Sequence, residues 1–237
     1  MITKPTDPDP THGTGIVVAV DGTSGSGKSS TCRGVASRLG LRYLDTGAMY
    51  RAMTWWMLEH GVDVHDAEAV AARCTEAVID SGTDPLGPTI HVDGHDVGVA
   101  IRTEQVTGSV SPVSTVPAVR ARLVQLQRAE IAAAVEGAGI VVEGRDIGSV
   151  VAPDAPVKLY LTADPAARAA RRAAEEGGSD VAAVERSLRG RDEIDSGRAV
   201  SPLTMVEGAV HLDTTAYTLE EVVDLVVGLV EAVESPA

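Results

Sequence analysis

The chain has 237 residues, of which 44% are hydrophobic, 23% are charged and only 3% are aromatic, with no Phe. This length and composition predict a folded protein with one main core of aliphatic side chains and room for a small additional domain. The formal net charge of −14 argues against general binding to nucleic acids or membrane surfaces, and no apolar run is long enough to span a bilayer.

Residues 1–14 contain three prolines and lack the apolar stretch of a signal peptide. They are predicted to be a disordered lead-in, and the protein is expected to be cytoplasmic. The two cysteines, Cys32 and Cys74, have no metal-ligand spacing, so reduced thiols are expected.

Short apolar runs alternate with longer amphipathic segments along the rest of the chain. Buried strands are predicted at 15–21, 41–47, 139–144, 157–161 and 211–215. Helices are predicted at 29–39, 48–60, 116–136, 164–198 and 219–234. Strands alternating with helices predict an α/β fold with a mainly parallel sheet, whose ligands bind beyond the carboxyl ends of the strands.

The segment 62–101 has a different pattern. Apolar and polar residues alternate in TIHVDGHDVG around the Asp93–Gly94 pair, which predicts a β-hairpin. Together with VID at 78–80, the hairpin indicates a small antiparallel insertion.

The first predicted strand leads into GTSGSGKS, which fits the phosphate-loop pattern G-x-x-x-x-G-K-[ST]. Glycines allow the backbone N–H groups to surround a phosphate, and the following helix adds its N-terminal partial positive charge. Oriented backbone dipoles therefore let an acidic chain bind a polyanion. Lys28 is predicted to contact the β- and γ-phosphates, and the Ser29 hydroxyl to contact Mg²⁺. The predicted ATP-binding residues are Gly22, Thr23, Ser24, Gly25, Ser26, Gly27, Lys28, Ser29 and Ser30.

The loop alone indicates ATP or GTP and does not identify the acceptor. The chain contains no Asn, so it cannot carry the N-K-x-D segment with which GTPases read guanine. The strand at 139–144 ends in a Glu-Gly-Arg-Asp cluster, in which Arg145 is suited to binding an anion.

Five segments then resemble the bacterial cytidylate kinases, a family of nucleoside monophosphate kinases that phosphorylate CMP and dCMP. They are DGTSGSGKSS, YLDTGAMYR, IRTEQV followed by Ser, EGRDIGSVVAPDAPVKLYL and RDEIDSGRAVSPL, and they keep the family's order and spacing from about residue 15 to 230. The resemblance implies a three-layer fold of the P-loop NTPase type, with Mg²⁺ as cofactor, ATP and CMP or dCMP as ligands, and a monomer. It implies a core of 15–61, 102–164 and 199–237, an inserted NMP-binding domain at 62–101 and a helical lid at 165–198.

The resemblance also implies an acceptor site. Arg51 and Arg145 correspond to arginines that bind the acceptor phosphate, and Thr46 stands where the family usually has Ser. Positions that read cytosine correspond to Ser111, Arg120 and Asp146. Phosphate and sugar contacts correspond to Arg191, Asp195 and Arg198. The residues expected to act in catalysis are Lys28, Arg145 and Arg191.

Other interpretations of these residues stay open from the sequence. Arg120 could be a solvated surface charge, Arg145 and Asp146 a structural ion pair, and Asp195 a helix cap. The arginines of 164–198 could be solvated helix charges or a lid that closes over the phosphates. Asp21 could orient waters on Mg²⁺. For the whole chain, the alternatives to a CMP kinase are a kinase of another small acceptor and a non-enzymatic nucleotide-binding module.

Overall fold

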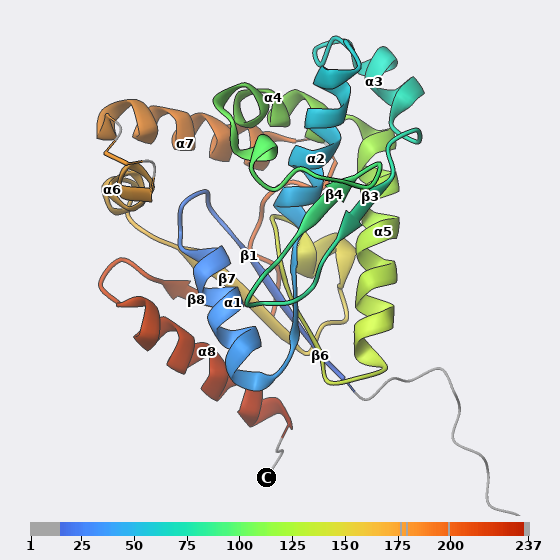
Figure 1. Ribbon diagram of the computed structural model, residues 1–237. Coiled ribbons are helices and arrows are strands. Elements are labelled where there is room, and N and C mark those ends of the chain that lie inside the picture. The colour runs from blue at the N-terminus through green and yellow to red at the C-terminus, as the bar shows by residue number, and fades with distance from the viewer. Residues whose placement is uncertain (1–14, 176, 179, 199, 235–237) are drawn as a thin grey trace, which may run out of the picture.

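The computed structural model describes residues 15–234 apart from 176, 179 and 199 (Figure 1). The expected lead-in 1–14 lies outside the described residues. The described chain forms a parallel sheet between two layers of helices, with a small second sheet beside it. This is the α/β three-layer fold that the sequence predicts.

Five strands form the main sheet in the order β2-β6-β1-β7-β8, and each neighbouring pair is parallel. Their bounds are β1 Ile16–Gly22, β2 Arg42–Asp45, β6 Gly139–Glu143, β7 Val157–Thr162 and β8 Val210–Asp213. All five predicted strands are therefore present. The central strands are apolar on both sides because helices cover both faces of the sheet.

Four long helices cover the sheet: α1 Lys28–Leu39, α2 Thr46–Glu59, α5 Pro117–Val135 and α8 Leu219–Glu234. Successive side chains of β1 point to opposite faces, so Val18 and Val20 join a core with α1 and α8. Ala19 belongs to the other core, which contains side chains from α2 and α5. The sheet thus holds the start of α1 and the start of α2 at the same edge, where the loops after β1 and β2 lie.

The insertion contains the predicted antiparallel sheet, made of β3 Ile79–Ser81, β4 Ile90–Val92 and β5 His95–Asp96. Asp93 and Gly94 form the hairpin turn, with φ of 51° and 79°. The indole N–H of Trp56 donates to Asp93 Oδ2 at 2.8 Å, which ties the hairpin to α2. The insertion is therefore fixed against the helix that begins at the cavity described below.

Three helical elements here were missed in the sequence: α3 Ala67–Arg73, the 3₁₀ helix η1 Ala100–Arg102 and α4 Glu104–Thr115. The helix α4 carries Gly108 and Pro112, both of which disfavour a helix interior. It forms nevertheless because Val106 and Val113 are buried in the core. Tertiary packing outweighs local propensity here.

The arginine-rich segment forms two helices, α6 Pro165–Glu175 and α7 Val181–Gly197, which lie above the loop after β1 (Figure 1). Most of α7 is exposed, as predicted, but Leu188 is buried, and so is Arg168 of α6. These two side chains lie beside Gly25 in the loop after β1. No helix in the described part of the chain is both long and apolar enough to cross a membrane.

Candidate active site

A cavity of about 680 Å³ lies at the carboxyl ends of the parallel strands. β1, β2 and β6 end here at Gly22, Asp45 and Glu143, and the insertion and α7 provide the opposite walls. Parallel strands bring all their carboxyl ends to one edge, so residues far apart in sequence meet there.

The phosphate loop has the backbone conformation that its glycines predict. Gly22 has φ 148°, and a Cβ on it would lie 2.0 Å from the carbonyl oxygen of Leu161 on β7. Gly27 has φ 84° and precedes the first residue of α1. A side chain at Gly22 would clash with β7, and a side chain at Gly27 would strain the backbone because of its positive φ.

Most of the predicted ATP-binding residues line the cavity. They are Ser24, Gly25, Gly27, Lys28, Ser29 and Ser30. The described lining does not include Gly22, Thr23 or Ser26. The Lys28 ammonium donates to the carbonyl oxygens of Gly22 at 3.0 Å and Thr23 at 2.7 Å. The loop therefore curves around its own lysine.

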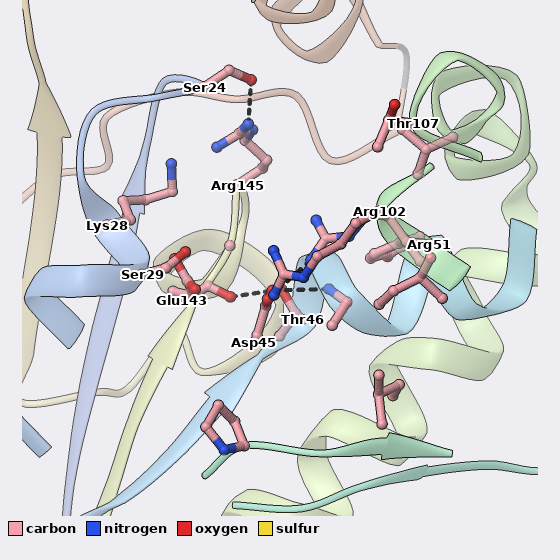
Figure 2. A pocket seen from close by; sticks show the side chains of 18 of the residues that line it. Ser24, Lys28, Ser29, Asp45, Thr46, Arg51, Arg102, Thr107, Glu143 and Arg145 are labelled. Carbon is pink, nitrogen blue, oxygen red and sulfur yellow. Dashed lines mark hydrogen bonds and ion pairs between the residues drawn. The ribbon is translucent and has the colours of Figure 1, made fainter. Parts of the chain in front are cut away.

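Lys28 and Glu143 form the charged floor of the cavity, and Figure 2 shows both close to Ser29. Burial, followed by the nearby positive charge of Arg145, lowers the pKa of Lys28 to about 7. Burial and the neighbouring carboxylate of Asp45 raise the pKa of Glu143. The Tyr43 hydroxyl donates to Glu143 Oε1 at 2.5 Å. Burial thus disfavours the charged form of both side chains.

All nine residues predicted for the acceptor site line the same cavity. They are Thr46, Arg51, Ser111, Arg120, Arg145, Asp146, Arg191, Asp195 and Arg198. They come from α2, α4, α5, α7 with its cap, and the turn after β6. A single cavity therefore contains the phosphate loop and the whole predicted acceptor set.

Arg51 and Thr46 project from the first turns of α2. A guanidinium N–H of Arg51 donates to Asp45 Oδ2 at 3.0 Å, and the Thr46 hydroxyl donates to the carbonyl oxygen of Glu143 at 2.7 Å. Asp45 also caps α2 by accepting from the N–H of Ala48. The same carboxylate thus begins the helix and orients Arg51 (Figure 2).

Arg120 is a buried charge, only 3% exposed, so the surface-charge interpretation is wrong. It forms an ion pair with Asp146, which is also buried, and lies over the ring of Tyr50 at 5.4 Å. Arg145 and Asp146 do not pair with each other. Asp146 pairs with Arg120, and Arg145 pairs with Asp195. A buried charge pair at a cavity wall presents fixed donors and acceptors to a ligand.

Arg145 connects the phosphate loop to α7. Its guanidinium donates to the Gly22 carbonyl at 2.5 Å, to Ser24 Oγ at 2.6 Å and to Asp195 Oδ2 at 2.8 Å. Asp195 also pairs with Arg198 at 3.1 Å. Asp195 lies inside α7, so it does not cap the start of a helix. Arg191 lines the cavity from the same helix.

Asp21 has a different setting from the one expected. Its two carboxylate oxygens accept the backbone N–H groups of Ile147 and Gly148, each at 2.8 Å. Burial is the largest cause that raises the pKa of Asp21 to about 6. It is 4% exposed and is not among the described residues that line the cavity. These bonds hold the π-helix Ile147–Val151 against β1, which favours a structural role.

Some arginines of 164–198 are solvated helix charges, and others face the cavity as a lid over the phosphates would require. Arg189 forms an exposed ion pair with Glu185 one turn away. Arg168 is buried, and Arg171 lines the cavity and donates to Thr214. Arg172 also lines the cavity. Part of the segment is therefore solvated surface and part is cavity wall.

Sequence reasoning assigned no role to several cavity residues. Asp45, Glu143 and Arg102 line it, and Figure 2 shows Arg102 and Arg51 reaching into the same part of the cavity. Asp45 and Glu143 are the last residues of β2 and β6 and lie near the carboxyl ends of two predicted strands, a position that could have marked them. Arg102 belongs to IRTEQV, one of the segments that carry the family resemblance. No local sequence pattern predicted η1, the 3₁₀ helix that positions Arg102.

The phosphate loop and several arginines line one cavity at the carboxyl ends of a parallel sheet. This arrangement defines the class of protein as a P-loop kinase or a related phosphotransferase. The sequence model of the cytidylate kinase family matches residues 18–232, and the chain belongs to this family.

The chain is also similar to curated cytidylate kinases. It is 57% identical to the one from Streptomyces griseus, covering 91% of this chain and 93% of that relative. It is 52% identical to the one from Nocardia farcinica, covering 89% and 91%. It is 49% identical to the one from Mycobacterium leprae, covering 92% and 96%.

Proposed function

We propose that the protein transfers the γ-phosphoryl group of ATP to CMP or dCMP, giving ADP and CDP or dCDP. Membership in the cytidylate kinase family supports the reaction. The observation that carries the site assignment is the shared cavity, which all nine expected acceptor residues line together with Lys28 and Ser29. We expect the enzyme to act as a monomer in the cytoplasm. Light scattering measures its oligomeric state.

The donor would bind with its phosphates in the loop. Backbone N–H groups and the start of α1 favour negative charge, and Lys28 supplies a point charge. Because burial lowers the pKa of Lys28, phosphates arriving beside it would favour its protonated form. The loop is thus most cationic when the nucleotide is present.

The acceptor would bind on the opposite side. Arg51 and Arg145 suit a dianionic phosphate because a guanidinium offers parallel charge-assisted hydrogen bonds. Asp146 can accept from the exocyclic amine of cytosine, and Ser111 and Arg120 can donate to its ring acceptors. Asp195 and Arg198 would contact the sugar. In this assignment the insertion 62–101 serves as the NMP-binding domain and 165–198 as the lid.

The cavity also suits a magnesium ion carried by ATP. Ser29 is exposed to the cavity and hydrogen-bonds Glu143, so a hydroxyl and a carboxylate lie beside the phosphate loop. The described residues include no group of three or more His, Cys, Asp or Glu that could hold a metal. Mg²⁺ commonly keeps waters and phosphate oxygens as ligands, so Ser29 with one carboxylate is sufficient. The ion supplies charge neutralisation on the phosphates when bound.

Chemistry in this cavity needs little acid–base help. The attacking oxygen of a nucleotide phosphate is already ionised, so alignment and charge neutralisation dominate. Lys28, Arg145 and Arg191 would stabilise the charge of the transferring group. Covering the cavity with α6 and α7 would exclude water, which otherwise competes as acceptor.

The test is an ADP-release assay with ATP, Mg²⁺ and each of CMP, dCMP, UMP, AMP and GMP. We expect CMP and dCMP to give the highest kcat/KM. A chain that uses AMP or UMP as well as CMP contradicts the proposed acceptor. No acceptor-dependent ADP release with any of the five would contradict the kinase assignment.

A further inference from the structure

The lid helix α7 contacts the phosphate loop through one stripe of side chains. Leu188, Asp192 and Asp195 are spaced by four and three residues, which puts them on the same face of a helix. Leu188 Cδ1 lies 3.3 Å from the point where a Cβ on Gly25 would be. Asp195 pairs with Arg145, which itself contacts the loop.

Asp192 makes the direct contact of this stripe with the loop backbone. The backbone N–H of Ser24 donates to Asp192 Oδ1 at 2.8 Å. The other carboxylate oxygen of Asp192 pairs with Arg168 of α6. Arg168 also donates to the carbonyl oxygen of Ser24 at 2.8 Å. Both backbone groups of Ser24 are therefore bound by one charge pair that joins the two lid helices.

This charge pair is largely removed from water. The side chain of Arg168 is 8% exposed and that of Asp192 is 14% exposed. A partly buried carboxylate without its partner is costly, so the pair keeps a fixed geometry. Asp192 is not among the described residues that line the cavity, whereas its neighbour Arg191 is. A carboxylate facing phosphates would repel them, and this one faces the loop backbone instead.

We propose that Asp192 is a positioning residue that sets the place of α7 relative to the phosphate loop. Fixing Asp192 on Ser24 fixes the helix that carries Arg191, Asp195 and Arg198. The placement of these side chains relative to Lys28 then depends in part on this backbone contact. The proposal rests on the proposed function only for its kinetic consequence, since the contact between Asp192 and Ser24 is a feature of the fold.

The test combines hydrogen–deuterium exchange with kinetics on the full chain. In Asp192→Ala we expect amides of 165–198 to exchange faster by roughly tenfold, the effect of losing a hydrogen bond to a charged group. Amides of β1 and β6 should keep their exchange rates. We expect kcat to fall by a similar factor because the lid arginines lose their alignment. The matched control is Glu193→Ala, which removes the neighbouring exposed carboxylate of the same helix.

Two further variants separate positioning from general destabilisation. Asp192→Asn keeps an oxygen that can accept from Ser24 and loses the ion pair, so we expect an intermediate effect. The double variant Asp192→Ala, Arg168→Met also removes the guanidinium that Asp192→Ala leaves without its carboxylate partner. We expect this double variant to fold, and its amides in 165–198 to exchange at least as fast as those of Asp192→Ala.

The proposal is overturned if the amides of 165–198 exchange at the wild-type rate in both Asp192→Asn and the double variant. Equal loss of kcat in Asp192→Ala and Glu193→Ala also overturns it. If the wild-type protein fails to use CMP, the proposed function fails, and the exchange result still decides the role of Asp192.

Discussion

The proposed donor side of the cavity comes from one stretch of nine consecutive residues, Gly22 to Ser30, of which six line it, whereas the proposed acceptor side collects side chains from four helices and one turn. The donor side offers mainly backbone N–H groups and one lysine. The acceptor side offers guanidiniums held by carboxylates, in the pairs Arg51–Asp45, Arg120–Asp146 and Arg145–Asp195.

This difference explains how a chain with a net charge of −14 can hold two anionic ligands. Backbone dipoles add no net charge, and each of these arginines is balanced by the carboxylate with which it pairs. The donor side should therefore be sensitive to its single lysine, and the acceptor side to the loss of either member of a pair. The following predictions test this comparison, in order of decreasing effect.

Breaking the buried pair of the acceptor side should have the largest effect. Asp146→Ala leaves Arg120 buried without its partner, which should cost about 3–5 kcal/mol of unfolding free energy. Urea unfolding measures the loss. The control is Glu185→Ala, which breaks the exposed pair with Arg189 and should cost less than about 1 kcal/mol. Equal losses of unfolding free energy in the two variants would show that the buried Arg120–Asp146 pair matters no more for stability than the exposed Glu185–Arg189 pair.

The milder Asp146→Asn variant keeps one acceptor oxygen and tests ligand reading. If Asp146 accepts from the cytosine amine, the KM for CMP should rise more than the KM for ATP. Equal changes on both sides would leave Asp146 a purely structural residue.

Removing the charge of the donor side should abolish most turnover. Lys28→Met should lower kcat by about 10²–10³-fold, because a charged contact to the transferring group is lost. The fold should persist. Lys158→Met is the matched control, since Lys158 is not among the described lining residues of the cavity. Near-normal turnover of Lys28→Met would remove Lys28 from the mechanism.

The same lysine predicts a pH dependence of stability in the absence of nucleotide. The pKa of Lys28 is about 7 in the folded protein and 10.5 as the reference value. Between these pH values the unfolded chain binds more protons, so the Lys28 contribution to stability rises with pH across this window. The stability difference between wild type and Lys28→Met should therefore change in favour of wild type from pH 7 to pH 9. Urea unfolding at several pH values measures it, and a constant difference contradicts the lowered pKa.

A smaller effect is expected for the outer arginine of the acceptor side. Arg51→Ala should raise the KM for CMP by roughly tenfold, as for one hydrogen bond between charged groups, while the KM for ATP stays unchanged. Arg51→Lys should recover only part, because an ammonium lacks the guanidinium fork. Arg42→Ala, at an exposed position outside the described cavity lining, is the control. An unchanged KM for CMP in Arg51→Ala would remove Arg51 from the site.

The smallest effect is expected for Thr46→Ser, which introduces the residue that the family resemblance predicts at this position. The hydroxyl that donates to Glu143 is kept, and only one buried methyl group is lost. Unfolding free energy should fall by about 1 kcal/mol or less, with the KM for CMP nearly constant. A large rise in this KM would mean that the methyl group itself shapes the acceptor side.

The sequence by itself determined the five strands of the main sheet, the four long helices that cover it, the phosphate loop and the family resemblance. These features are local: apolar alternation, Gly at positions with positive φ, and a lysine directly after them. Asp93 and Gly94 likewise marked the hairpin of the insertion. Each signal lies within a few residues of what it predicts, so neighbouring side chains and backbone sterics are sufficient.

Only the tertiary structure decided which charges pair. Arg120 joins Asp146 rather than solvent, Arg145 joins Asp195 rather than its neighbour, and Asp192 binds the backbone of Ser24. These partners are 26, 50 and 168 residues apart in sequence. No local pattern encodes such pairs, because they depend on how the sheet and the helices α6 and α7 bring distant segments to the same edge. Burial then makes them strong, and burial is a property of the folded chain as a whole.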